Sequence, residues 1–255
     1  MEKDDDKSMS FPEHAPPEYS IVIPVYNEEE NLKPLAEGIV NTMNSFKKPY
    51  EVILVDDGST DCSKEVLKEL CDQYPIFRGF IFQINCGKTA AFDAGFKNAI
   101  GTVIITLDAD LQYDPGDIPR LLNRLEECDA VCGYRVKRSD SWIKRISSKI
   151  ANFVRNKLSD ESIRDVGCSL KVFKKECLDD VKLFEGMHRF LPTLIKMEGY
   201  KVIEFPVKHF HRKHGYSKYN ISNRVFKSFR DLLAVRWMKR RYLNYKIVEQ
   251  YSRED

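Results

Sequence analysis

Continuous apolar runs alternate with segments of helical periodicity through the first half of the chain. The runs at residues 21–25, 52–55 and 103–107 carry few polar residues. Between the first two, apolar residues recur at helical spacing: Leu32, Leu35, Ile39, Met43 and Phe46. Strands that are apolar on both faces are typical of a parallel sheet covered by helices. The alternation predicts an α/β fold with a mostly parallel central sheet and right-handed crossovers.

Composition divides the chain into three parts. Residues 1–18 carry charges and prolines with little apolar periodicity, which predicts a disordered tail. Residues 19–220 carry the α/β pattern, and its rhythm weakens after the predicted strand at 130–133. We therefore expect a nucleotide-binding half followed by a mixed, acceptor-side half. Residues 221–255 form a separate basic amphipathic segment.

Charge and cysteine content suggest a compartment. The net charge of +2 conceals an acidic start and a densely basic stretch over residues 208–246. Seven scattered cysteines form no Cys-x-x-Cys pair, which indicates a reducing, cytosolic environment. No stretch approaches the roughly 20 apolar residues of a spanning helix. We expect a peripheral protein on the cytoplasmic face of a membrane, or the soluble part of a membrane protein, and no nucleic-acid partner.

Polar clusters follow three of the predicted strands at the point where each ends. They are Tyr26-Asn27-Glu28, Asp56-Asp57-Gly58-Ser59 and Asp108-Ala109-Asp110-Leu111-Gln112. In open α/β sheets, ligands bind beyond the carboxyl ends of the strands. The three clusters therefore predict one shared crevice. The run Ser59-Thr60-Asp61 is also expected to cap the helix that follows it.

The third cluster has the spacing of a metal site. Asp108 and Asp110 lie two residues apart just past a strand, so both can face one hard divalent cation. Gln112 continues the spacing with a neutral oxygen. We expect Mg²⁺ or Mn²⁺ together with a phosphate ligand. The loop of a calcium-binding helix-loop-helix, the Walker loop and the Gly-x-Gly-x-x-Gly fingerprint are all absent from the sequence.

Histidines suggest an anion site more than a metal site. His209, His211 and His214 cluster beside Arg212, Lys213 and Lys218. Their spacing is irregular for zinc, and the surrounding cations favour an anion-binding loop.

Four segments together resemble family 2 glycosyltransferases, in the branch that makes dolichyl- or polyprenyl-phosphate sugars. They lie at residues 20–28, 55–61, 107–112 and 212–218. The resemblance implies a GT-A (Rossmann-like) fold and a metal-dependent enzyme. The reaction would be inverting transfer of a hexose from a nucleotide diphosphate sugar, of the GDP-mannose or UDP-glucose type, to a polyprenyl or dolichyl phosphate.

The resemblance also assigns roles to single residues. The residues implied to bind the nucleotide are Pro24, Tyr26, Glu28, Asp56, Asp57, Lys88 and Asp108. The metal would be bound by Asp108, Asp110 and Gln112, and the catalytic residues would be Asp110, Asp165, Arg212 and Lys218. The acceptor phosphate would be bound by Arg135, Arg145 and Ser148. A lipid monophosphate is largely dianionic at neutral pH, so the nucleophile needs no general base. We therefore expect Asp165 to orient Arg135 or Arg145.

Two other functions fit parts of the sequence. A chain-extending polysaccharide transferase of the same superfamily usually carries Gln-x-x-Arg-Trp, but here Leu233 stands where the glutamine would be, ahead of Arg236-Trp237. A non-catalytic scaffold that binds a nucleotide sugar would not need Asp108, Asp110, Gln112 and Arg212 intact.

Two basic amphipathic segments occupy residues 142–158 and 224–248. In the second, Phe226, Phe229, Leu233 and Trp237 form one stripe flanked by Lys and Arg. This pattern predicts a helix that lies on an anionic membrane surface. The alternative is a helix that packs on the domain and keeps a solvated basic face. A membrane-bound partner subunit would also fit.

Overall fold

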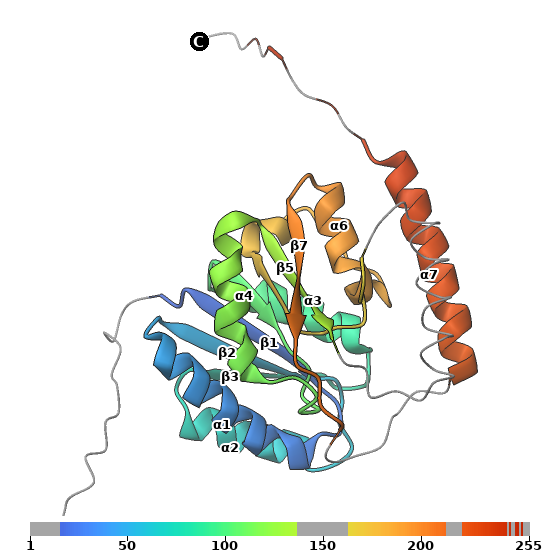
Figure 1. Cartoon of the computed structure of the whole chain (residues 1–255). Helices are drawn as coiled ribbons and strands as arrows, with labels where there is room; N and C mark the ends of the chain where they lie inside the picture. The colour runs from blue at the N-terminus through green and yellow to red at the C-terminus, as the bar shows by residue number, and fades with distance from the viewer. Residues whose placement is uncertain are drawn as a thin grey trace, which may run out of the picture.

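The computed structural model describes residues 16–136, 163–212, 221–243, 245, 248–249 and 251, with backbone only for 221–228 (Figure 1). Most of the predicted tail and all of the amphipathic segment at 142–158 lie outside these residues. The described part contains a seven-stranded sheet in the order β3-β2-β1-β4-β6-β5-β7. Its strands are β1 (Tyr19–Val25), β2 (Tyr50–Asp56), β3 (Phe77–Ile81), β4 (Val103–Thr106), β5 (Ala130–Arg135), β6 (Lys171–Lys174) and β7 (Val202–Val207).

The sheet is mostly parallel, as the apolar runs predict. β1 pairs in parallel with β2 and β4, β2 with β3, and β5 with β7. β6 is the exception, because it runs antiparallel to both of its neighbours, β4 and β5. This reversed strand joins the first half of the sheet to the second.

Helices cover both faces of the sheet (Figure 1). One face packs against α1 (Glu29–Phe46), α2 (Ser63–Gln73) and α4 (Ile118–Arg124), and the other against α3 (Lys88–Asn98) and α6 (Leu191–Met197). The strands alternate accordingly: Ile21 and Ile23 join the first core cluster, whereas Val22 joins the second. Short 3₁₀ helices complete the fold: η1 (Pro115–Asp117), η2 (Leu125–Glu127), η3 (Lys175–Leu178) and η4 (Met187–Phe190).

The last helix, α7 (Ile221–Arg241), packs on η4 and α6 along the side of the domain (Figure 1). Leu232 and Val235 are buried there against Met187, Phe190 and Leu194. The contact also includes an ion pair in which Arg189 Nη2 lies 2.8 Å from Asp231 Oδ2. None of the described helices is long and apolar enough to span a bilayer.

The apolar stripe predicted for this helix faces solvent. Phe229, Leu233 and Trp237 are 47%, 44% and 65% exposed, and the side chain of Phe226 is outside the description. The helix thus packs on the domain through one face and presents the predicted stripe on another.

Candidate active site

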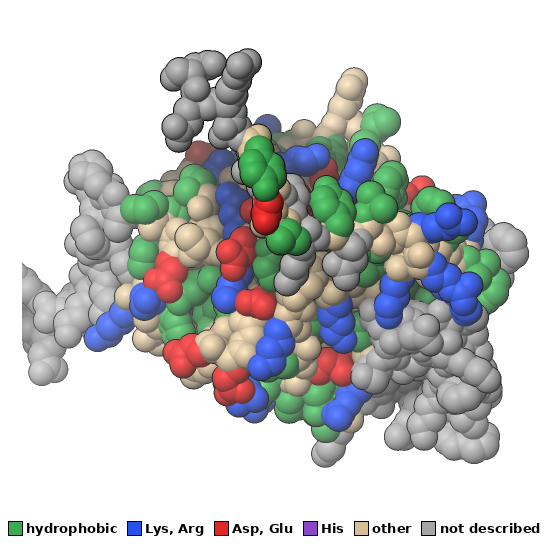
Figure 2. Space-filling model, turned by 90° about the horizontal axis from the view of Figure 1, so that it is seen from above, with side chains coloured by type: hydrophobic (Ala, Val, Ile, Leu, Met, Phe, Trp, Pro, Cys, Tyr) green, Lys and Arg blue, Asp and Glu red, His purple; other side chains and the backbone are tan. Residues whose placement is uncertain are grey.

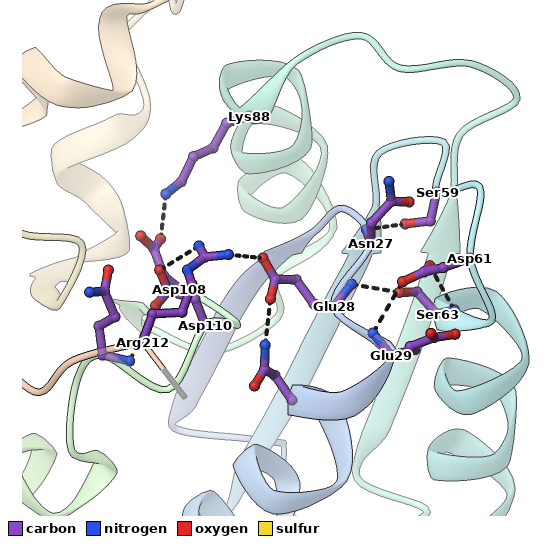
Figure 3. Close-up of polar contacts among 12 residues, drawn as sticks. Asn27, Glu28, Glu29, Ser59, Asp61, Ser63, Lys88, Asp108, Asp110 and Arg212 are labelled. Atoms are coloured by element: carbon purple, nitrogen blue, oxygen red, sulfur yellow. Dashed lines mark hydrogen bonds and ion pairs between the residues drawn. The ribbon is translucent and has the colours of Figure 1, made fainter. Parts of the chain in front are cut away.

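The loops after β1 and β2 are joined by hydrogen bonds between backbone and side chain (Figure 3). Ser59 Oγ accepts from the Asn27 N–H at 2.9 Å, and Asn27 Oδ1 accepts from the Thr60 N–H at 2.7 Å. Ser63 Oγ accepts from the Glu28 N–H at 2.8 Å. Asn27 has a φ of 52°, a left-handed conformation that asparagine tolerates. These bonds hold the two loops as one rim.

The expected cap of α2 is made by Asp61 alone. The N-cap position is Cys62, whose side chain makes no capping bond. Asp61 Oδ1 instead accepts from the Ser63 N–H at 3.0 Å. Ser59 belongs to the joint between the loops, so the capping prediction is wrong for that residue.

Asp57 is held by the segment between β3 and α3. Its Oδ1 accepts from the N–H groups of Cys86 (2.7 Å) and Gly87 (3.0 Å). Asn85 Nδ2 donates to Asp57 Oδ2 at 3.1 Å and to the Asp57 carbonyl at 3.0 Å. Burial raises the pKa of the Asp57 carboxyl, although the two backbone donors oppose the shift. Most of the hydrogen-bond acceptor positions of the Asp57 carboxylate are therefore filled by the protein.

Gly58 makes this contact possible. Its φ is +69°, and a Cβ there would lie 2.5 Å from the Ile84 carbonyl carbon and 2.6 Å from Asn85 N. Only glycine allows the two backbones to approach so closely. Asp56, by contrast, is fully buried, and its Oδ1 accepts from the Ser59 N–H at 3.0 Å. That geometry gives Asp56 a role in forming the turn.

Two cations meet three carboxylates where β1 and β4 end (Figure 3). Lys88 Nζ lies 2.5 Å from Asp108 Oδ1. Arg212 bridges two carboxylates, with Nη2 2.9 Å from Asp110 Oδ2 and Nη1 3.3 Å from Glu28 Oε1. Residues far apart in the sequence thus converge on one point.

A cleft of ≈ 310 Å³ opens over these groups. It is lined by Pro24, Val25, Tyr26, Glu28, Asp57, Asn85, Gly87, Lys88, Asp108, Ala109, Asp110 and Arg212. Most of the residues predicted to bind a nucleotide therefore border a single cavity. The lining also includes Asn85, which the sequence argument did not select. Asn85 lies four residues beyond the end of β3, so a search for polar residues directly after the strands does not reach it.

The carboxylates suit a hard divalent cation. Burial raises the pKa of Asp110, the neighbouring Asp108 adds to the shift, and Arg212 opposes it. Two close carboxylates at a partly dry site need positive charge, which Lys88 and Arg212 supply in this structure. Mg²⁺ and Mn²⁺ are often held by one or two carboxylates plus substrate phosphates, so the residues fit such an ion. Within the described chain, no three His, Cys, Asp or Glu side chains are grouped to hold a metal by themselves.

Gln112 connects the acidic loop to the segment that carries Arg212. The Gln112 side-chain Nε2 donates to the Phe210 carbonyl at 3.4 Å, and the backbone carbonyl of Gln112 accepts from the Phe210 N–H at 2.9 Å. β4 ends at Thr106, residues 109–110 form a turn and Leu111 has a φ of 57°, so Gln112 is not aligned with Asp110 by extended alternation. The metal role of Gln112 remains a prediction.

The segment at 208–212 is fixed at further points. The Lys208 N–H donates to Asp117 Oδ2 at 2.8 Å, and Asp117 is buried at the start of α4. The rings of Tyr113 and His209 meet edge to face at 5.4 Å between centroids. These contacts explain how a residue after β7 reaches carboxylates after β1 and β4. Asp117 and Tyr113 were missed from the sequence because they act through their neighbours.

In the second half of the sheet, Arg135 at the end of β5 forms a bidentate pair with Asp165. The distances are 2.6 Å from Nε to Oδ2 and 2.8 Å from Nη2 to Oδ1. Burial lowers the pKa of Arg135, but its bond with Asp165 outweighs this and raises the pKa above the usual value. Asp165 also accepts from the Gly167 N–H at 3.2 Å. This geometry favours the orienting role for Asp165. Arg145, Ser148 and Lys218 lie outside the described residues.

Fold and site together define the class of protein. A mostly parallel sheet, an acidic loop after β4 and a ligand cleft at the strand ends form an α/β fold of the GT-A type. A family model, Glycosyl transferase family 2, matches residues 20–182. The chain belongs to this family.

Curated relatives narrow the likeness. The chain is 38% identical over 229 residues to a dodecaprenyl-phosphate galacturonate synthase from Rhizobium johnstonii, covering 88% of this chain and 68% of the relative. It is 40% identical over 205 residues to an undecaprenyl-phosphate 4-deoxy-4-formamido-L-arabinose transferase from Proteus mirabilis, covering 79% of this chain and 62% of that protein. A transferase of the same name from Edwardsiella ictaluri is 38% identical, with 63% of its length covered. The chain thus spans about two thirds of these relatives.

Solved structures confirm the GT-A fold. A glucosyl-3-phosphoglycerate synthase from Mycobacterium tuberculosis superposes with a TM-score of 0.64 at 15% identity, over 89% of this chain and 81% of the other. The mannosyltransferase PcManGT from Pyrobaculum calidifontis, solved with GDP-Man and Mn²⁺, superposes with a TM-score of 0.59 at 21% identity, over 91% and 66%.

Proposed function

We propose that this chain transfers a hexose from a nucleotide diphosphate sugar, of the GDP-mannose or UDP-glucose type, to a polyprenyl or dolichyl phosphate with inversion. The observation that carries the donor half is the convergence of Asp57, Lys88, Asp108, Asp110 and Arg212 on one cleft. The acceptor half is supported by relatives named as polyprenyl-phosphate sugar transferases.

At the donor end, Pro24, Tyr26, Glu28 and Asp57 bind the base and ribose. Lys88 and Asp108 complete the nucleotide site. Asp108 and Asp110 offer the hard oxygen ligands that Mg²⁺ or Mn²⁺ takes, and an ion held there supplies positive charge for the departing diphosphate. Gln112 is the third proposed ligand. Asp56 supports Asp57 through the turn that it forms with Ser59.

Arg212 binds the leaving diphosphate in this proposal. Its guanidinium contacts Glu28 through Nη1 and Asp110 through Nη2, and a phosphate can bind both nitrogens in place of the two carboxylates. Lys218 adds a second cation on the same segment. Donors placed where negative charge develops lower the barrier to departure of the diphosphate.

At the acceptor end, Arg135 binds the lipid phosphate, together with Arg145 and Ser148. The bidentate pair with Asp165 fixes the plane of the Arg135 guanidinium and leaves its remaining N–H groups for a phosphate. The phosphate arrives deprotonated, so Asp165 serves as a positioning residue and no proton has to be removed.

We propose further that α7 rests on the cytoplasmic face of a membrane. Phe229, Leu233 and Trp237 are exposed, and Lys and Arg side chains surround them. Figure 2 shows such a mixture of basic and hydrophobic side chains at the side of the molecule where Figure 1 places α7. A basic, aromatic-bearing face suits an anionic surface. A membrane partner subunit could share this face.

The test is a transfer assay with short polyprenyl phosphate, Mn²⁺ or Mg²⁺ and a panel of nucleotide sugars. Asp110→Ala should lower transfer by roughly 100-fold or more, because it removes a group that organises the departing diphosphate. Asp72→Ala on the exposed end of α2 is the matched control and should leave the rate unchanged. Transfer that survives Asp110→Ala, or that requires a hydroxyl acceptor, would contradict the proposal.

A further inference from the structure

We propose that the cleft prefers a uracil nucleotide to a guanine nucleotide, because Asn85 occupies an acceptor position on Asp57 that guanine would need. This inference rests on the proposed function, in which Asp57 binds the base of the donor. It goes further by naming the base and the residue that selects it.

The Asp57 carboxylate has little acceptor capacity left. An ionised carboxylate offers about four lone-pair positions. Oδ1 accepts from Cys86 N–H and Gly87 N–H, which fills both of its positions. Oδ2 accepts from Asn85 Nδ2 at 3.1 Å, which fills one more. One position therefore remains for a ligand.

The orientation of the Asn85 amide follows from its partners. Its nitrogen lies 3.0 Å from the Asp57 carbonyl and 3.1 Å from Asp57 Oδ2, and both of these atoms can only accept. A flipped amide would place an oxygen against two oxygens, so the assignment is fixed by the network. The amide oxygen consequently points away from Asp57 and does not extend the acceptor edge of the carboxylate.

The bases differ in the number of donors that they present to a carboxylate. Uracil offers one, the N3–H between two carbonyl groups, and one free position on Oδ2 matches it. Guanine offers two adjacent donors, N1–H and the exocyclic N2–H, which pair best with both oxygens of a carboxylate. Cytosine carries its donor on the exocyclic N4 and has an acceptor at N3, so it presents like polarity to the carboxylate at the position where uracil offers N3–H. A site that leaves a donor unpaired discriminates strongly against that ligand.

Other acidic side chains in the cleft do not supply the missing acceptor. Glu28 and Asp110 are grouped around Arg212, and Asp108 lies beside Lys88, at the part of the cleft where the proposed function places the diphosphate and the metal. Guanine would have to displace the Asn85 amide. The contact with Gly58 holds the backbone of residues 84–85 in place, and displacement of the Asn85 amide breaks its two hydrogen bonds to Asp57.

The first measurement is the affinity of the whole chain for UDP, GDP and CDP by titration calorimetry with Mn²⁺ present. All three share the diphosphate, so the ratio of their dissociation constants isolates the base. UDP should bind about tenfold or more tightly than GDP, the usual size of the penalty for one unpaired donor. CDP should also bind more weakly than UDP. Because CDP and UDP have rings of the same size, this comparison separates hydrogen bonding from fit.

The second measurement repeats the titrations with Asn85→Ala. Removal of the amide frees one position on Oδ2 and the Asp57 carbonyl, so the preference for UDP over GDP should shrink severalfold. Gln83→Ala, exposed on the same segment, is the matched control and should keep the wild-type ratio. Circular dichroism establishes whether each variant is folded. If Asn85→Ala does not fold, Asn85→Ser, which retains a short polar side chain, takes its place.

The outcomes separate the two proposals. GDP binding as tightly as UDP would overturn the uracil preference and leave the proposed transferase function standing. An unchanged ratio in folded Asn85→Ala would overturn the role of Asn85. Failure of all three nucleotides to bind would overturn the proposed function itself, and the inference with it.

Discussion

Asp57 shows at the scale of one residue how position sets chemistry. Its carboxyl is buried, accepts three N–H groups from residues 85–87 and lines the cleft. Burial raises its pKa, so it takes up a proton at a higher pH than an ordinary aspartate, whose pKa is about 3.9. Protonation converts one acceptor into a donor, which then faces the N–H of a base.

We expect acid to weaken nucleotide binding through this residue. As the pH falls from neutrality, wild-type affinity for UDP should drop toward that of Asp57→Asn, and the drop should begin above the ordinary aspartate range. Asp57→Asn mimics the protonated carboxyl and has no titration there. Comparing the two proteins at each pH cancels the titration of the diphosphate. Calorimetric curves that stay parallel at every pH would show that Asp57 does not control the effect.

Arg135 and Asp165 allow a test of positioning against base catalysis. Arg135→Ala should raise the KM for polyprenyl phosphate by roughly tenfold to a hundredfold, the value of a charge-assisted hydrogen bond, and leave UDP affinity unchanged. Asp165→Asn should act in the same direction but more weakly, since it loosens the Arg135 guanidinium.

Steady-state kinetics with varied acceptor measure both effects, and Arg124→Ala, on the exposed end of α4, is the control. A general base would behave differently. Asp165→Asn would then lower kcat, leave KM unchanged and abolish the acidic limb of the pH profile. That result would contradict the positioning role.

At the scale of the element, α7 has two apolar faces with different fates. Leu232 is buried against η4 and α6, whereas its neighbour Leu233 is exposed. Leu232→Ala should lower the free energy of unfolding by about 2–3 kcal/mol, because it opens a cavity in a packed contact. Leu233→Ala should change it by less than about 0.5 kcal/mol. Urea unfolding followed by circular dichroism measures both, and equal effects would show that α7 does not pack as described.

The elements that the sequence predicts well are those whose pattern is local. Buried parallel strands follow from apolar runs such as residues 52–55, and helices from the spacing of Leu32, Leu35 and Ile39. The direction of β6 could not be predicted, because the short stretch Lys171–Lys174 carries no sign of which way it pairs. The packed face of α7 was equally hidden, since the choice between Leu232 and Leu233 depends on what η4 and α6 offer.

Some residues of the candidate site can likewise be predicted from local sequence, and others depend on tertiary contacts. Asp57, Asp108 and Asp110 are visible in the sequence because each follows an apolar strand directly. Asn85 comes after a short strand that ends at Ile81, four residues before it. Its importance depends on the close contact with Gly58, which is a tertiary feature. The ion pair between Asp110 and Arg212 spans 102 residues and follows only from the fold.

At the scale of the whole molecule, α7 adds an exposed surface of apolar and basic side chains to the domain that carries the cleft. A lipid phosphate stays in its bilayer, so an enzyme that uses one must work at the membrane surface. The stripe of Phe229, Leu233 and Trp237 offers apolar side chains to the interface, and the basic residues around it are attracted to anionic lipid. Each Lys or Arg near such a surface contributes about 1 kcal/mol.

We therefore expect the whole chain to sediment with vesicles that contain anionic lipid and to remain free with vesicles of neutral lipid. The variant Phe229→Ala/Leu233→Ala/Trp237→Ala should lose most of the binding. Arg230→Gln/Arg236→Gln/Arg240→Gln should weaken it by roughly 100-fold, as the loss of about 3 kcal/mol implies. Ile100→Ala, an exposed apolar residue at the end of α3, should bind like wild type. Salt should weaken binding of the wild type more than binding of the charge variant, which keeps fewer basic residues. If both triple variants bound as tightly as wild type, attachment would have to come from another part of the molecule, and α7 would be a packing helix alone.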